Sequence, residues 1–304
     1  MPVNLVYGLI SVSAFFWGAN FVLAGSVLAD LPPLWAAALR FLLGAGVMLA
    51  VARWQGDDVL GLARSHWRAH VLLGILGIVG FNLFFFYAMA QTSAANGALI
   101  MATNPLLTTL LASALLHEQI ASRQLAALPV ALAGVAVVIS QGELTQLSHF
   151  AIGHGDALML CANLVWALYN VATRRFMPRG SPVGNTALMM TVGAVVLTMI
   201  AVSQGAEFAL PGLHAGTALA IMVLGGTVLA YLFWGMGIQR LGAGRAALFL
   251  NLVPVFAMLI GGVIGTPPSA VQLIGGALVL FGVTLAALPL GAAAQARGAQ
   301  PQQR

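Results

Sequence analysis

The chain has 304 residues, of which 61% are hydrophobic and only 6% charged, and its formal net charge is +5. Soluble domains carry about 25% charged residues, so this composition excludes a soluble globular protein. We expect an all-α integral membrane protein, because a helix satisfies its own backbone hydrogen bonds in lipid.

Ten hydrophobic segments follow one another, each near the length of about 20 residues that a bilayer crossing requires. Short links separate them and leave no room for a soluble domain. The polar residues 291–304 are predicted to form a disordered cytoplasmic tail. The predicted transmembrane helices cover residues 5–24, 33–53, 70–90, 95–115, 122–141, 154–174, 182–204, 213–237, 243–263 and 267–289.

The basic residues predict how these helices are oriented. All 12 are arginines; Arg40 lies within the second predicted helix, and the others fall on the side of the N-terminus. The positive-inside rule therefore places both termini in the cytoplasm. The basic character reflects this topology, so we do not expect a nucleic-acid partner.

An offset of 149 residues relates matching positions in the two halves of the chain. It carries Trp17 to Trp166 and Pro105 to Pro254. Because five helices are an odd number, the second of two five-helix repeats must be inverted in the membrane, which is a transporter architecture. The predicted repeats are residues 1–142 and 153–290.

The paired residues are expected near the membrane midplane. With a rise of about 1.5 Å per residue, Trp17 and Trp166 lie about 18 Å deep from opposite faces. Pro105 and Pro254 reach a similar depth, and a proline there removes a backbone hydrogen bond and kinks the helix. We interpret the two prolines as hinges; a packing kink without a ligand is the alternative.

Polar and aromatic side chains gather on single faces of the same helices. Ser13, Trp17 and Asn20, for example, have the spacing i, i+4, i+7 of one helical face. For any one asparagine, a hydrogen bond between packed helices is the alternative to ligand binding. Taken together, amides beside aromatic rings indicate a central cavity for a small amphipathic ligand. The predicted substrate-binding residues are Trp17, Asn20, Asn82, Tyr87, Met101, Asn104, Trp166, Tyr169, Asn170, Tyr231 and Trp234.

Two single residues need separate interpretation. Arg40 either ties down helix carbonyls, with Asp30 or Glu207 as structural partners, or contacts a substrate carboxylate. The one cysteine, Cys161, is expected to be buried as a small hydrophobic residue.

The interiors of the predicted helices lack Asp, Glu, Lys and His. This absence favours a neutral or zwitterionic substrate and argues against proton coupling through a buried carboxylate. It also argues against a metal site, a cofactor or an intramembrane enzyme. The expected partners are therefore a small-molecule substrate and the lipid bilayer. Efflux of other neutral metabolites or drugs, and a non-transporting membrane scaffold, stay open as alternatives.

The motifs resemble those of a known family. Trp17-Gly18-Ala19-Asn20-Phe21, Leu39-Arg40-Phe41, and Asn104-Pro105 followed by His117-Glu118 are similar to motifs of the EamA-type transporters of the drug/metabolite transporter superfamily. The resemblance covers residues 5–289, but the second half departs from it, with Ala167 after Trp166 and Thr266-Pro267-Pro268 in place of the acidic turn. The aromatic-rich lining looks most like the exporters of amino acids, including aromatic ones (the YddG type). The resemblance implies an inner-membrane exporter.

Overall fold

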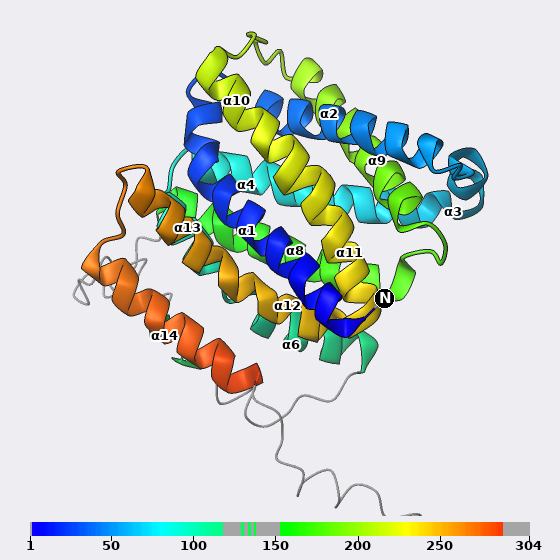
Figure 1. Cartoon of the computed structure of the whole chain (residues 1–304). Coiled ribbons are helices and arrows are strands. Elements are labelled where there is room, and N and C mark those ends of the chain that lie inside the picture. Colours follow the sequence, from blue (N-terminus) through cyan, green and yellow to red (C-terminus); the bar gives the residue numbers. More distant parts are fainter. Residues whose placement is uncertain (1, 118–128, 131–132, 135–136, 138–152, 288–304) are drawn as a thin grey trace, which may run out of the picture.

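The computed structural model describes residues 2–117, 129–130, 133–134, 137 and 153–287, and all regular structure within these ranges is helical (Figure 1). The first half contains α1 (Val3–Leu28), α2 (Pro33–Trp54), α3 (Val59–Gly74), the π-helical η1 (Ile75–Gly80), α4 (Phe81–Met89), α5 (Ala94–Met101) and α6 (Asn104–Leu116). The second half contains α8 (His154–Phe176), α9 (Pro182–Ser203), α10 (Leu213–Ile221), the π-helical η3 (Met222–Leu229), α11 (Ala230–Leu241), α12 (Ala243–Ala247), the 3-10 helix η4 (Leu248–Asn251), α13 (Leu252–Val263) and α14 (Ala270–Ala287).

Helices α2 and α9 begin and end at residues that the 149-residue offset relates. α2 begins at Pro33 and α9 at Pro182, where a proline costs no hydrogen bond because the first N–H groups of a helix have no partner within it. Each helix has 22 residues and is followed by a glutamine and then a glycine with positive φ, 79° at Gly56 and 64° at Gly205. A left-handed glycine is a common helix terminator. α2 and α9 also pack against each other.

The offset also relates the packing partners of other helices. α1 packs against α11 and α13, and α8 packs against α4 and α6. Adding 149 to α1, α4 and α6 leads to α8, α11 and α13, so the two sets of contacts correspond. The division into two repeats and the inversion of the second stay predictions.

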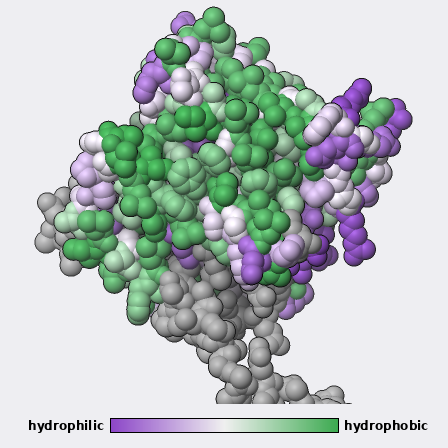
Figure 2. Space-filling view, in the orientation of Figure 1, coloured by the Kyte–Doolittle hydropathy of each residue, from purple (hydrophilic) through white to green (hydrophobic). Residues whose placement is uncertain are grey.

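Within the described residues, seven helical segments are long and apolar enough to cross a membrane, and two shorter apolar helices follow them. The fifth predicted helix, residues 122–141, lies mostly outside the described residues, as does the predicted tail 291–304. The face in Figure 2 is largely apolar, and hydrophilic side chains gather near the outer end of α3. The seven crossing segments are Val3–Leu28, Pro33–Trp54, Val59–Met89, Asn96–Leu116, His154–Phe176, Pro182–Ser203 and Leu213–Leu241.

The two π-helical segments lie at related positions, because adding 149 to residues 75–80 gives 224–229. A π turn widens the helix and is frequent at functional sites. In both segments a glycine carbonyl accepts a hydrogen bond from a side chain of another helix. Gly77 accepts from the Tyr231 hydroxyl at 3.0 Å, and Gly226 accepts from the Trp17 indole at 3.0 Å.

Two expectations from the sequence are corrected. α3 begins at Val59, eleven positions before the predicted start at residue 70, and its backbone departs from helical geometry at His66 (φ −130°). Asp58 caps this helix by accepting from the Gly61 N–H at 2.9 Å, a signal that a search for apolar runs passes over. Cys161 is exposed rather than buried, because it lies on the outward face of α8.

Candidate functional site

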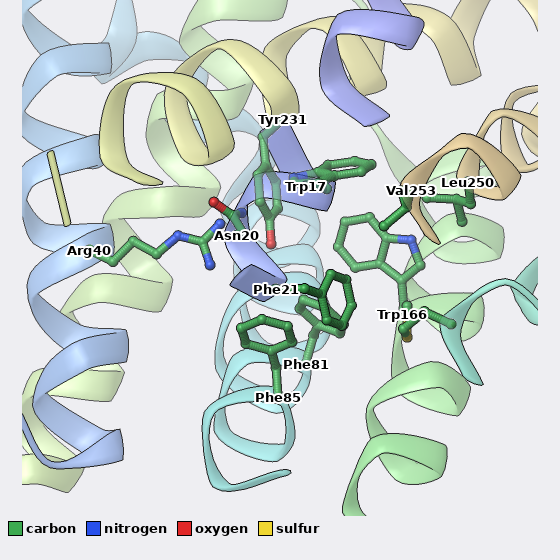
Figure 3. A pocket seen from close by; sticks show the side chains of 11 residues that line it. Trp17, Asn20, Phe21, Arg40, Phe81, Phe85, Trp166, Tyr231, Leu250 and Val253 are labelled. Atoms are coloured by element: carbon green, nitrogen blue, oxygen red, sulfur yellow. The ribbon is translucent and has the colours of Figure 1, made fainter. Parts of the chain in front are cut away.

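A cavity lies between helices of both halves of the chain (Figure 3). It offers about 30 Å³ to the centres of water molecules, enough for about two of them and too little for an amino acid. The lining residues are Trp17, Asn20, Phe21, Arg40, Phe81, Phe85, Met101, Trp166, Tyr231, Leu250 and Val253.

Aromatic rings form most of the cavity wall. Trp17 meets Trp166 edge to face, with ring centroids 5.3 Å apart, and Tyr231 lies 5.9 Å from Trp17 and 5.6 Å from Trp166. Phe81 lies 4.8 Å from Trp166. Edge-to-face contacts of this kind orient the rings and add stabilisation beyond area burial. The wall suits an apolar or aromatic ligand group.

Arg40 reaches the cavity from α2 and is only 2% exposed. Its Nε donates to the Thr227 hydroxyl at 2.6 Å, Nη1 to the Asn82 amide oxygen at 3.2 Å, and Nη2 to the Gly226 carbonyl at 3.0 Å. Asn20 satisfies both of its polar atoms when its oxygen accepts from Nη2 at 2.9 Å. All these partners are neutral. Asp30, expected as a partner, instead accepts from the Gly212 N–H.

Two glycines let the halves approach closely in the same way. A Cβ at Gly226 would collide with the Asn20 amide, and a Cβ at Gly77 would collide with the Tyr169 ring. Adding 149 converts Asn20 into Tyr169 and Gly77 into Gly226, so the two contacts correspond. The side chains at these equivalent contacts differ, an amide at Asn20 and an aromatic ring at Tyr169. The polar part of the site therefore lies at the Asn20–Gly226 contact.

The two equivalent tryptophans, Trp17 and Trp166, also differ in their hydrogen bonding. The Trp17 indole N–H donates to the Gly226 carbonyl at 3.0 Å. The Trp166 indole N–H is buried and has no hydrogen-bond partner among the described residues, and Figure 3 shows it turned toward Leu250 and Val253. The Gly77 carbonyl, which the offset would assign to it, accepts from Tyr231 instead. Buried donors without a partner are rare. An unpaired N–H at a cavity wall is therefore a candidate hydrogen-bond donor to a bound ligand.

A second polar cluster ties α6, α8 and α11 together away from the cavity. The Asn104 amide donates to the Asn163 side-chain oxygen at 2.7 Å. The Asn170 amide donates to the Asn104 side-chain oxygen at 3.1 Å, and the Trp234 indole donates to the Asn170 oxygen at 3.1 Å. These side chains thus use one another as hydrogen-bond partners. Their geometry is that of hydrogen bonds between packed helices.

Each proline lies just after a departure from regular α-helix, a two-residue interruption in the first half and a 3-10 turn in the second. α5 ends at Met101 and α6 begins at Asn104, one residue before Pro105; in the second half, η4 precedes α13, which contains Pro254. The Asn163 amide donates to the Ile100 carbonyl at 3.0 Å, beside the first break. A break in a membrane helix requires such partners for its freed backbone groups.

The predicted substrate-binding residues thus divide into two groups. Trp17, Asn20, Met101, Trp166 and Tyr231 line the cavity, and so does Arg40, while Asn82 binds Arg40 from outside the lining. The residues Asn104, Tyr169, Asn170 and Trp234 are buried but do not line it.

Tyr87 is 36% exposed and is not among the residues that line this cavity. It lies five positions after Asn82, which turns it about 140° around a regular helix, and Phe86 takes the buried face. The prediction passed over five apolar residues. For Phe21, four residues after Trp17, and for Phe81 with Phe85, helical spacing was an available signal. For Leu250 and Val253, only their nearness to Pro254 pointed to the site.

Comparison with known proteins places the chain among transporters. The model of the EamA-like transporter family matches it twice, at residues 4–140 and 153–288. The uncharacterized transporter YyaM of Bacillus subtilis is 38% identical to it, over 92% of this chain and 93% of that protein. The aromatic amino acid exporter YddG of Ancylobacter novellus is 28% identical, over 92% and 96%. A crystal structure covering 96% of this chain and 98% of its own has a TM-score of 0.69 at 24% identity, which supports the fold.

Proposed function

Because the chain belongs to the EamA-like transporter family, we propose that it exports amino acids, aromatic and other neutral ones, by alternating access. The observation that carries this proposal is the buried Arg40 guanidinium at the edge of a cavity walled by aromatic rings. A guanidinium matches the two oxygens of a carboxylate, and aromatic rings suit an apolar side chain. A relative named as an aromatic amino acid exporter supports the same substrate class.

In this proposal the two halves rock against each other around the cavity in the bacterial inner membrane. The cavity must widen before an amino acid can enter it. The interruption before Pro105 and the 3-10 turn before Pro254 are the places where the helices can bend with the least loss of backbone hydrogen bonding. Trp17 and Trp166 flank the substrate, and Arg40 holds its carboxylate.

Counterflow of labelled phenylalanine into proteoliposomes tests the proposal. Trp17→Ala and Trp166→Ala should each lower the rate at least about tenfold at equal protein level, because each removes one wall of the cavity; a tenfold loss corresponds to about 1.4 kcal/mol. Trp54→Ala is the matched control, since Trp54 is 86% exposed, and it should leave the rate unchanged.

Three outcomes separate the alternatives. Unchanged flux in both cavity variants would overturn the proposed lining. Competition by unlabelled neutral metabolites or drugs, with no competition by amino acids, would favour the rival efflux function. Absence of flux for every compound would favour a scaffold.

A further inference from the structure

The polar groups around the cavity are unevenly divided between donors and acceptors. The Arg40 guanidinium already occupies four nearby acceptors, the Thr227 hydroxyl, the Asn82 and Asn20 amide oxygens and the Gly226 carbonyl. On the donor side, the Trp166 indole N–H is buried without a partner. A ligand that enters therefore meets an available donor in the cavity wall, whereas the nearby acceptors already receive hydrogen bonds from Arg40; Asn251 Oδ1, an acceptor without a partner among the described residues, does not line the cavity. This arrangement suits a ligand that accepts hydrogen bonds.

The cavity lining contains one positive charge, on Arg40, and no negative charge. Of the described acidic side chains nearest the helix ends, Asp30 bonds to the Gly212 N–H and Asp156 to the Thr92 hydroxyl, so neither pairs with Arg40. A buried cation that only neutral dipoles surround is costly. An anion entering the cavity would balance the charge, whereas an ammonium group would add a second positive charge.

We propose that the cavity prefers monocarboxylates with an aryl-bearing, apolar body and no amino group over amino acids, and that each export cycle moves one negative charge outward. This inference rests on one part of the proposed function, export through this cavity, and names monocarboxylates in place of amino acids as the preferred substrate class. The carboxylate pairs with Arg40 and the aryl group packs among Trp17, Trp166 and Tyr231.

Charge then sets the direction of transport. A bacterial membrane is negative inside, so the membrane potential drives a monoanion outward and leaves the distribution of a zwitterion unchanged. The loaded site is neutral and the empty site carries the Arg40 charge, so one negative charge leaves per cycle. Such export needs no buried carboxylate for proton coupling.

Three compounds that share one aryl body test the preference in proteoliposomes of the wild-type protein. They are phenylalanine, 3-phenylpropanoate, which lacks only the amino group, and 2-phenylethylamine, which lacks only the carboxylate. The half-saturation concentration should be at least tenfold lower for 3-phenylpropanoate than for phenylalanine, and 2-phenylethylamine should not be carried. Protein-free liposomes give the passive leak to subtract.

The electrical prediction uses the same vesicles. With valinomycin and a tenfold potassium gradient, the equilibrium distribution of 3-phenylpropanoate should shift about tenfold toward the positive side, and that of phenylalanine should not move. Arg40→Met introduces the residue that the offset places at the equivalent position, Met189. It should remove the preference for 3-phenylpropanoate. If this variant fails to insert into the membrane, the comparison of the three compounds on the wild-type protein still tests the substrate preference.

The outcomes distinguish the two proposals. Carrier-dependent flux of phenylalanine, with weaker flux of 3-phenylpropanoate or none, overturns this inference and leaves amino-acid export standing. Flux of 3-phenylpropanoate without flux of phenylalanine supports the inference and overturns export of amino acids. Absence of carrier-dependent flux for both compounds overturns both proposals.

Discussion

At the scale of single residues, the site is asymmetric within a framework that the 149-residue offset describes. Trp17 and Trp166 are equivalent positions, yet one indole N–H is bonded to Gly226 and the other is free. The difference arises because Tyr231 takes the Gly77 carbonyl, whereas its counterpart by the offset, Asn82, does not take the Gly226 carbonyl. Equivalent residues thus serve different purposes, one holding helices together and the other facing the cavity.

Replacing each tryptophan by phenylalanine should separate these purposes. Trp17→Phe removes a hydrogen bond and should lower the free energy of unfolding by about 0.5–1.5 kcal/mol. Trp166→Phe removes an N–H without a partner, so the protein should stay as stable as the wild type while its half-saturation concentration for substrate rises about tenfold, the loss of one ligand hydrogen bond. Thermal unfolding in detergent and concentration-dependent flux measure the two effects.

The opposite pattern would contradict this assignment. A large loss of stability in Trp166→Phe would mean that its N–H has a structural partner in the protein. Unchanged substrate affinity in the same variant would mean that the ligand does not use this donor.

At the scale of helices, close packing at the π-helical segments depends on glycines. Gly77→Ala places a methyl group against the Tyr169 ring, which is fully buried and cannot turn aside. Overpacking of this kind costs about 1–3 kcal/mol and outweighs the gain of up to about 1 kcal/mol in helix propensity. Gly235→Ala on α11 is the control, because no atom lies within 4 Å of its added Cβ. The apparent unfolding temperature should fall for the first variant, and should stay equal or rise for the second.

Equal unfolding temperatures for the two variants would show that the helices around η1 can separate at little cost. The close contact between Gly77 and Tyr169 would then not be a determinant of stability.

The helix order and the paired tryptophans and prolines could be read from the sequence, because they depend on apolar length and on repetition. The division of asparagines between cavity and helix packing could not. Asn20 and Asn104 both lie on polar faces, and their roles depend on which helix stands opposite. The π turns add a second obstacle, because they shift the phase of every later residue in the helix. Rules based on 3.6 residues per turn therefore assign residues after η1 and η3 to the wrong face of the helix.

At the scale of the whole molecule, the orientation of the two halves decides whether the chain can alternate its access. Gln55 and Gln204 are related by the offset, each is exposed, and each follows the last residue of its helix, α2 or α9. If the second repeat is inverted, these equivalent positions lie on opposite sides of the membrane, with five crossings between them. The arginine distribution places Gln55 in the cytoplasm.

Single-cysteine labelling tests this arrangement on a Cys161→Ser background, which removes the one native thiol. A membrane-impermeant maleimide added to intact spheroplasts should label Gln204→Cys and should reach Gln55→Cys only after permeabilisation. Labelling of both from the outside, or of neither, would require an even number of crossings between them. In that case the predicted helix at 122–141 would not span the membrane, the two halves would share one orientation, and alternating access by rocking of inverted repeats would lose its structural basis.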